Sequence, residues 1–443
     1  MGKTKRRLSS SQIIILGFAA AILAGSLALM LPFATQDGSG ASFADALFTA
    51  TSAVCVTGLI VQDTATYWSG FGQMVLLLLI QVGGMGVITF TVVIGSAAGQ
   101  KISLKQRSTM QEAIAAPKIG GIVKLTGRII AMTALFEGLG ALLLALPFCR
   151  ELGLPQGLWY GIFHSVSAFC NAGFDLMGTR APFSSLTAYA ASPAVVLPVM
   201  ALIVIGGIGF MTWMDLRDNG LRVRRWRMQS KVVLVTSGLL LLLPAVYFFF
   251  FEFAALPAGE RLWGSLFQSV TARTAGFNTL DLNGMSEGGL AIMIVLMLTG
   301  GAPGSTAGGM KVTTLAVMIS TALAIFRRRE ETHFFGRRVE EETVRSAMAI
   351  LTLYLFLFFT GGLLISRLED LPLLTCLFES ASAVGTVGIT LGITPQLGLL
   401  SRGILIVLMY SGRVGALTLI FAALSGDSRG NASRLPRERL MVG

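Results

Sequence analysis

Four short phrases in this chain each run from a Phe to a Gly through small and polar residues. They read Phe48-TATSAVCVT-Gly58, Phe163-HSVSAFCNA-Gly173, Phe267-QSVTARTA-Gly276 and Phe378-ESASAVGTV-Gly388. Because Gly takes positive φ at little cost, the backbone beside it can turn consecutive carbonyl oxygens toward one axis. Rings of such carbonyls replace the water shell of a dehydrated cation. The candidate cation-coordinating carbonyls are those of Val56, Thr57, Gly58, Asn171, Ala172, Gly173, Thr274, Ala275, Gly276, Thr386, Val387 and Gly388.

The composition is that of a membrane protein. Mean hydropathy is +0.74, 53% of the residues are hydrophobic and 13% are charged, which lies outside the range of soluble domains. A helix that crosses a bilayer needs about 20 mostly apolar residues. Stretches of this kind predict eight spans, near residues 13–33, 71–98, 125–148, 194–216, 231–251, 289–326, 344–366 and 402–424.

Each phrase lies between two of these spans, so the chain contains four related units. The phrase is predicted to form a half-helix that its Phe opens, about 15 Å long for ten residues. The C-terminal end of such a helix carries partial negative charge and favours a cation. Two full spans per unit bring every unit back to the same side, so the copies are parallel.

The predicted fold class is therefore an all-α polytopic membrane protein. Its four parallel repeats, each a span, a pore helix and a second span, surround one ion pore in a pseudo-fourfold arrangement. The predicted divisions are repeats at 1–100, 101–217, 218–327 and 328–424, followed by a tail at 425–443.

The second spans share a glycine cluster, and one of them is interrupted. The clusters are Gly83-Gly84-Met85-Gly86, Gly206-Gly207-Ile208-Gly209, Gly300-Gly301-Ala302-Pro303-Gly304 and Gly412-Arg413-Val414-Gly415. A helix cannot run through 299–312, since each Gly costs about 1 kcal/mol and an interior Pro about 3 kcal/mol. We expect a mobile intramembrane gate here; the alternative is a simple kink. The candidate gate residues are Gly300, Gly301, Ala302, Pro303, Gly304, Ser305, Thr306, Ala307, Gly308, Gly309, Lys311 and Arg413.

Two arginines are predicted at membrane depth, where a charged side chain is costly and usually functional. Arg413 either lines the cation path or braces the structure through Glu379 or carbonyls behind the filter. Arg273 lies within its half-helix and is favoured as a brace. Acidic residues shortly after the filter glycines form an outer vestibule or are solvated loop carboxylates: Asp63, Asp175 and Asp281.

Charge predicts the orientation and excludes some partners. The N-terminus and the segments 101–128, 215–231, 311–345 and 425–443 hold 27 of the 34 Lys and Arg residues, and such an excess marks the cytoplasmic side. Membrane topology and anionic lipid account for the net charge of +11 more simply than nucleic acid does. The basic segments 222–231 and 327–345 offer a docking surface for a charged partner.

Over essentially its whole length the chain resembles the Trk/Ktr/HKT superfamily of potassium transporters, most closely the Ktr membrane subunits. The resemblance rests on Ser52-AVCVTGL, Ser167-AFCNAGF, Arg273-TAGFNTLD, Ser382-AVGTVGIT, Gln81-VGGMG, Ile205-GGIGF and Gly412-RVG. It implies one potassium filter, a gating loop below it, and channel-like transport stimulated by sodium. Members with Ser at the first filter position tend to pass sodium, whereas Gly58 matches the potassium-selective members.

The resemblance also implies a homodimer in a bacterial plasma membrane, with both termini cytoplasmic and a cytosolic nucleotide-binding ring as regulator. Nucleotide would then bind the partner, and this chain would carry no cofactor of its own.

Two other function classes require residues of a different kind. An enzyme needs paired carboxylates, a Ser/His pair or metal ligands at depth, and only His164 and His333 are available. A sodium- or proton-coupled carrier needs acidic residues within spans, for which Glu137 is the only candidate in a first span.

Overall fold

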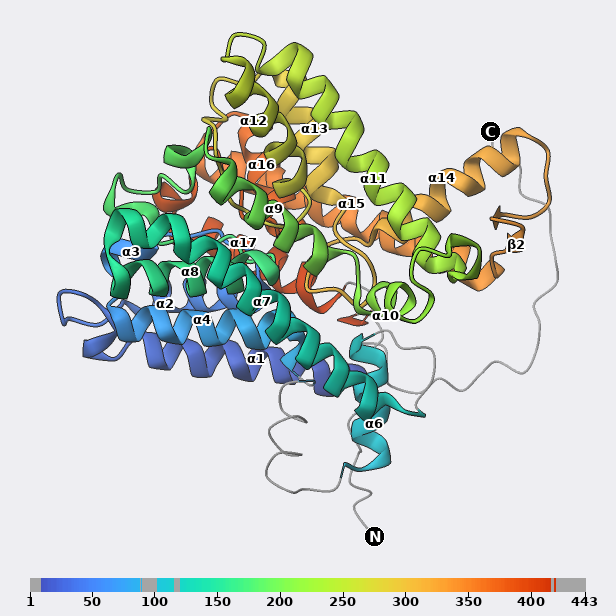
Figure 1. The fold of residues 1–443 in the computed structure, drawn as a ribbon, viewed down its shortest axis with the longest axis horizontal. Helices are drawn as coiled ribbons and strands as arrows, with labels where there is room; N and C mark the ends of the chain where they lie inside the picture. The colour runs from blue at the N-terminus through green and yellow to red at the C-terminus, as the bar shows by residue number, and fades with distance from the viewer. Residues whose placement is uncertain (1–8, 88, 90–101, 115–119, 416–417, 420–443) are drawn as a thin grey trace.

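The computed structural model describes residues 9–87, 89, 102–114, 120–415 and 418–419. The predicted tail at 425–443, the basic residues before residue 9 and the ends of the spans predicted at 71–98 and 402–424 lie outside these residues. The described chain is predominantly helical, as predicted (Figure 1).

The first span of each predicted repeat is one long helix. These are α1 (Ser10–Leu29), α7 (Ile122–Leu152), α11 (Met228–Tyr247), which the π-helical turn η5 (Phe248–Glu252) continues, and α15 (Glu341–Glu369). Within the described residues they are the four unbroken helices long and apolar enough to cross a membrane. Only 28–33% of their most apolar windows is buried, so most of this apolar surface faces outward, as lipid contact requires.

In the described residues, the second spans each have a helix that ends beside the glycine cluster. They comprise α4 (Gly70–Met85), α9 (Pro193–Gly207) with α10 (Phe210–Asn219), α13 (Glu287–Leu298) with α14 (Val312–Phe326), and α17 (Leu399–Val414). Gly86, Gly209 and Gly415 follow α4, α9 and α17 with φ of 86°, 90° and 91°, a conformation that ends a helix. The bend between α9 and α10 is 95°.

Four shorter helices hold the repeated phrases: α2 (Phe43–Cys55), α8 (Leu154–Phe169), α12 (Ala258–Thr271) and α16 (Leu373–Gly385). The prediction that the Phe opens each helix was wrong, because all four helices start upstream of it. Upstream residues set the start: the Ser42 hydroxyl caps α2, a position at which Ser favours initiation, and Pro155 lies in the first turn of α8, where its fixed φ suits a helix. The four Phe residues instead lie within their helices, and their side chains are fully buried in the core.

The helices pack in a closed cyclic order. Each short helix contacts the first span before it: α2 contacts α1, α8 contacts α7, α12 contacts α11 and α16 contacts α15. Each second span also contacts the short helix of the next unit, in the pairs α4 with α8, α9 with α12, α13 with α16, and finally α17 with α2. The last pair joins the end of the chain to its beginning, so the four units form a ring.

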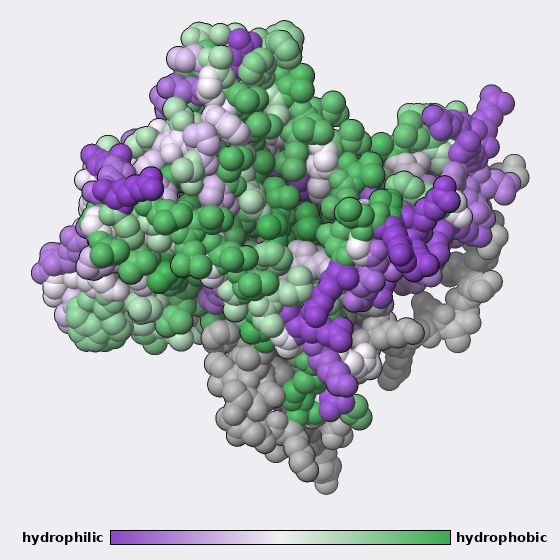
Figure 2. Space-filling model, in the orientation of Figure 1, coloured by the Kyte–Doolittle hydropathy of each residue, from purple (hydrophilic) through white to green (hydrophobic). Residues whose placement is uncertain are grey.

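The remaining elements lie toward the two ends of the bundle. One end holds η1 (Pro32–Ala34), α3 (Thr64–Tyr67), η2 (Met177–Thr179), η3 (Thr187–Tyr189) and η6 (Thr394–Gln396). The other holds α6 (Leu104–Ile114), η4 (Val223–Arg225) and the hairpin of β1 (His333–Phe334) with β2 (Arg337–Arg338), beyond the projecting end of α14 (Figure 1). Hydrophobic side chains cover the surface between two hydrophilic edges and form an apolar band that suits contact with lipid (Figure 2).

Candidate functional site

The four repeated glycines lie side by side around the ring. Gly58, Gly173, Gly276 and Gly388 all have positive φ, of 95°, 70°, 83° and 92°. A Cβ placed on Gly58 would lie 2.6 Å from the carbonyl oxygen of Ala172, and one on Gly173 would lie 2.6 Å from that of Ala275. A Cβ on Gly276 would strike the carbonyl of Val387, and one on Gly388 that of Thr57. Each glycine therefore packs against the carbonyl that precedes the next glycine in the ring.

A shared hydrogen-bond pattern holds the backbone that leads to these glycines. The residues two positions before them, Val56, Asn171, Thr274 and Thr386, also have positive φ. The amides of Thr57, Ala172 and Val387 each donate to a serine carbonyl of the preceding helix at 2.8 Å, and that of Ala275 donates to Thr271 at 2.9 Å. The hydroxyls of Ser52 and Ser382 accept from the amides of Gly58 and Gly388 at 3.0 Å.

The carbonyls just before the glycines have no donor of their own. Among the hydrogen bonds of the described residues, none ends on the carbonyl oxygen of Thr57, Ala172, Ala275 or Val387. All four residues are completely buried. Buried carbonyl oxygens are nearly always satisfied by a partner, so a ring of four such oxygens has the chemistry of a cation site.

Loop 299–311 lies between α13 and α14, next to this ring. Its backbone bonds to neighbouring second spans: the amide of Ala302 donates to Gly207 at 2.8 Å, and that of Gly309 donates to Gly412 at 3.2 Å. In return, the amide of Phe210 donates to Gly304 at 2.7 Å. The predicted interruption of this span is therefore observed as an ordered loop docked on the second spans of the second and fourth units.

The loop also contacts the segments that lead to the repeated glycines. The Thr306 hydroxyl donates to the carbonyl of Phe169 at 2.9 Å and accepts from the Asn171 side chain at 2.9 Å. A Cβ on Gly308 would overlap the side chain of Thr386, and one on Gly309 would lie 2.7 Å from the carbonyl of Gly385. The loop therefore has no space for larger side chains where it meets the segments before Gly173 and Gly388.

Arg413 joins the loop to two other elements. Its guanidinium donates to the carbonyls of Thr306, Gly83 and Gly84. Glu379, the partner considered from the sequence, instead accepts from Thr390 and Thr394. Arg413 also lines a cavity of about 270 Å³ beneath the loop, together with Ser305 and Lys311. Arg413 thus holds backbone carbonyls, as the brace interpretation expects, and its place in a cation path stays a prediction.

The other predicted charged residues are engaged in local structure. The Lys311 ammonium donates to the carbonyls of Ala307 and Gly308 at 2.8 and 3.2 Å, within the loop itself. Arg273 reaches the first span of its unit and donates to the Ser237 hydroxyl at 3.1 Å. The three acidic residues after the filter each accept nearby backbone amides: Asp63, Asp175 and Asp281.

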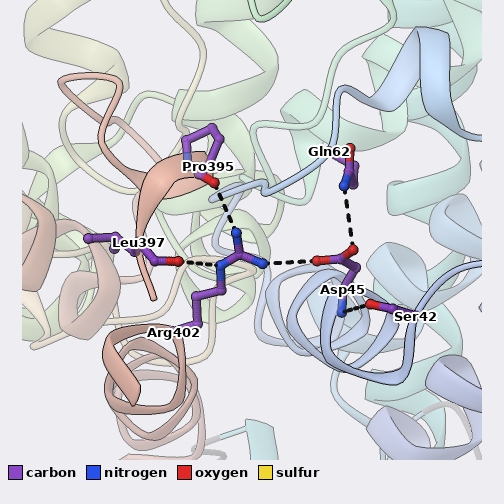
Figure 3. Close-up of polar contacts among 6 residues, drawn as sticks. All are labelled: Ser42, Asp45, Gln62, Pro395, Leu397 and Arg402. Atoms are coloured by element: carbon purple, nitrogen blue, oxygen red, sulfur yellow. Dashed lines mark hydrogen bonds and ion pairs between the residues drawn. The ribbon is translucent and has the colours of Figure 1, made fainter. Parts of the chain in front are cut away.

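An ion pair that sequence reasoning missed closes the ring between the fourth and first units. Arg402 at the start of α17 donates to the Asp45 carboxylate of α2 at 2.9 Å (Figure 3). The same guanidinium holds the carbonyls of Pro395 and Leu397 at 2.9 and 2.8 Å. The two side chains are 20% and 16% exposed, so this contact is less screened than a surface pair. No local sequence signal identifies partners so far apart in the chain.

The described residues contain no cluster of three or more His, Cys, Asp or Glu side chains placed to hold a metal ion. His164 and Glu379, both fully buried, bind instead to the segments that follow Gly173 and Gly388. A usable signal for them was present in the sequence, because the residue after each repeated Phe is polar: Thr49, His164, Gln268 and Glu379.

Comparison with known proteins adds independent information. A family model described as a cation transport protein, TrkH, matches residues 3–430. The chain is 38% identical over 451 residues to the potassium/sodium uptake protein NtpJ of Enterococcus hirae, covering 100% of this chain and 99% of that protein. It is 38% identical over 422 residues to the Ktr system potassium uptake protein B of Bacillus subtilis, covering 94% and 93%. The crystal structure of the potassium transporter TrkH from Vibrio parahaemolyticus has a TM-score of 0.75 at 19% identity, over 95% of this chain and 86% of that chain, and so has the same fold.

Proposed function

Because the chain belongs to the TrkH family of cation transport proteins, we propose that it is the potassium-translocating membrane subunit of a Ktr/Trk-type uptake system. The observation that carries this proposal is the ring of four buried carbonyls without donors, each beside a glycine of the neighbouring unit. Such a ring suits a dehydrated monovalent cation. Similar proteins named for potassium uptake support potassium as that cation.

The four repeats divide at 1–100, 101–217, 218–327 and 328–424 in this proposal. The filter consists of the backbone carbonyls at residues 56–58, 171–173, 274–276 and 386–388. Glycine at all four filter positions favours potassium selectivity, while the potassium/sodium name of one relative is compatible with sodium as a coupling or activating ion.

Loop 299–311 acts as the gate, and the observed arrangement corresponds to its closed position. Its docking on Gly206, Gly207 and Gly412, and the three carbonyls held by Arg413, support this assignment. Opening requires the loop to leave these hydrogen bonds. The cavity of about 270 Å³ beneath it would then connect with the filter.

The basic end of the bundle is the cytoplasmic side and binds the regulatory ring. Arg224, Arg225 and Arg227 are exposed there. With Lys231 and Arg337 they line a groove of about 760 Å³. Complementary charge across such a surface mainly accelerates association and makes it sensitive to salt. The functional unit is a homodimer in the plasma membrane, with nucleotide bound to the ring.

Reversing three of these charges, as Arg224→Glu, Arg225→Glu and Arg227→Glu together, is expected to weaken binding of the nucleotide-binding ring at least about tenfold at low salt. Filter selectivity should stay unchanged, because these residues lie in the exposed segment between α10 and α11, outside the segments that form the carbonyl ring. Pull-down of the ring at low and high ionic strength measures the effect. A double control, Arg150→Glu with Arg367→Glu, changes two exposed charges at the other end of the bundle. Wild-type binding insensitive to both salt and the triple reversal would locate the contact elsewhere.

Ion flux through the purified protein in liposomes tests the proposed function. A pore with a potassium filter passes current that reverses near the potassium equilibrium potential in a potassium-to-sodium gradient. The alternative, a sodium- or proton-coupled carrier of the same fold, would shift the reversal potential with the coupling ion. Glu137, the carboxylate considered for such coupling, accepts a hydrogen bond from Gln81 at 3.3 Å and lies next to Cys170. No current or flux of potassium would refute both forms of the proposal.

A further inference from the structure

One position in each repeat carries a buried polar side chain behind the filter. It is the residue after the repeated Phe, and its identity differs in every copy: Thr49, His164, Gln268 and Glu379. All four residues are 0% exposed. A buried polar side chain is costly unless it is hydrogen-bonded, so its partners indicate what the position does.

In the second unit, His164 supports the segment that follows the filter. Its Nδ1 lies 2.7 Å from the carbonyl of Tyr160, and its Nε2 accepts from the amide of Leu176 at 3.3 Å. Since a carbonyl only accepts, Nδ1 carries the proton and the ring is neutral. Leu176 comes three residues after Gly173. The imidazole thus connects the short helix to the chain on the far side of the filter glycine.

In the third unit, Gln268 makes the equivalent connection. Its side-chain amide donates to Asn278 Oδ1 at 2.6 Å, and Asn278 lies two residues after Gly276. The carbonyl of Asn278 in turn accepts from the amide of Leu186 in the second unit at 2.9 Å. This brace therefore also fixes the third unit against its neighbour.

In the fourth unit the brace is a carboxylic acid. Glu379 Oε2 accepts from the Thr390 hydroxyl at 2.8 Å, and Oε1 accepts from the Thr394 hydroxyl. Thr390 lies two residues after Gly388, and its hydroxyl also accepts from the amide of Gly392 at 3.0 Å. Both oxygens of the carboxyl group are thus used to fasten the segment that follows the fourth filter glycine.

The first unit lacks this connection. The Thr49 hydroxyl has no hydrogen-bond partner among the described residues, and the residue two positions after Gly58 is the apolar Ile60. Here the following segment is held from the second unit, where the amide of Phe183 donates to Asp63 at 2.8 Å. The unit without a brace provides an internal control for the three that have one.

We propose that in the second, third and fourth units the residue after the repeated Phe is a positioning residue for the filter, and that Glu379 determines potassium affinity and selectivity by fixing residues 389–394 behind Gly388. The inference rests on the proposed potassium function. Carbonyl rings discriminate between ions through the number and geometry of their oxygens. A brace acting on the chain immediately after a filter glycine limits how far that carbonyl ring can distort.

Transport kinetics of three substitutions at this position and one at its partner test the proposal. Glu379→Ala removes both hydrogen bonds, Thr390→Val removes one, and Glu379→Gln keeps an acceptor and a donor for the two hydroxyls. Thr49→Val is the matched control, since it changes the same repeat position where no bond is made. Potassium-dependent rubidium uptake into liposomes, normalised to the amount of monodisperse protein, gives KM, maximal rate and the inhibition constant for sodium.

We expect Glu379→Ala to raise KM for potassium about tenfold, the equivalent of two lost hydrogen bonds, and to make uptake more sensitive to sodium. Thr390→Val should raise KM for potassium and the sensitivity to sodium by a smaller factor. Glu379→Gln and Thr49→Val should keep both quantities near their wild-type values. Unchanged KM and sodium sensitivity in Glu379→Ala and Thr390→Val, or a Glu379→Gln variant as impaired as Glu379→Ala, would overturn the proposal. Failure of the wild-type protein to take up rubidium would instead refute the proposed function.

Discussion

A Gly58→Ser variant is expected to lose about tenfold or more of its discrimination between potassium and sodium. Gly58 has a φ of 95°, and its added Cβ would lie 2.6 Å from the carbonyl oxygen of Ala172. Either the backbone at Gly58 or the carbonyl at Ala172 must move, and both belong to the ring. Selectivity depends on the number and geometry of these oxygens. A distortion of the segment that one of the four repeats contributes should therefore admit sodium.

The permeability ratio from reversal potentials in mixed potassium and sodium solutions measures this effect. Gly70→Ser is the matched control: it lies in the same unit at the start of α4, and a Cβ there meets no atom within 4 Å. A folded Gly58→Ser protein with the permeability ratio of wild type would show that Gly58 lies outside the selective part of the path.

Deletion of residues 304–308 is expected to raise potassium flux through the membrane subunit alone by at least about tenfold, the scale set by a loss of about 1.4 kcal/mol from a closed state. The deletion removes Thr306, which bonds to Phe169, Asn171 and Arg413, and so releases the loop from the filter segments. Flux should also depend less on the nucleotide-binding partner, because the loop through which that partner would control flux has been shortened.

Two further variants separate gating from misfolding. Arg413→Gln keeps the loop intact but weakens its attachment to Thr306, and should raise basal flux in the same direction. Gly403→Ala is the matched control in α17, the helix that also holds Arg413, where a Cβ has nothing within 4 Å. If monodisperse deletion and Arg413→Gln proteins both conduct less than wild type, loop 299–311 supports the span and does not gate it.

Much of the architecture was predictable because its signals are local and repeated. Apolar stretches of span length identified α1, α7, α11 and α15. Glycines in register identified four turns with positive φ, since positive φ is a property of the residue and its immediate neighbours. Thr299 to Lys311 identified a break in the third second span, because Gly and Pro disfavour a helix in any context. In the comparisons, the family resemblance was confirmed.

Helix starts and polar partners were decided by contacts that the sequence does not order. The repeated Phe suggested a helix start, yet capping groups upstream set it and the Phe is packed inside. Arg413 was considered with Glu379, but the fold places it against Thr306, Gly83 and Gly84. The sequence predicts that a buried charged side chain has a partner but does not identify it, because possible partners from every unit lie near the same axis.

The sequence by itself therefore determined a fourfold repeated membrane protein with glycine turns and one interrupted span. Only the tertiary structure decided how the ring closes, through α17 on α2 and through Arg402 with Asp45. It also decided which partners the buried side chains of His164, Gln268 and Glu379 bind. The physical reason is that helix formation and glycine turns depend on residues a few positions apart, whereas these hydrogen bonds join segments whose proximity exists only after all four units have packed around one axis.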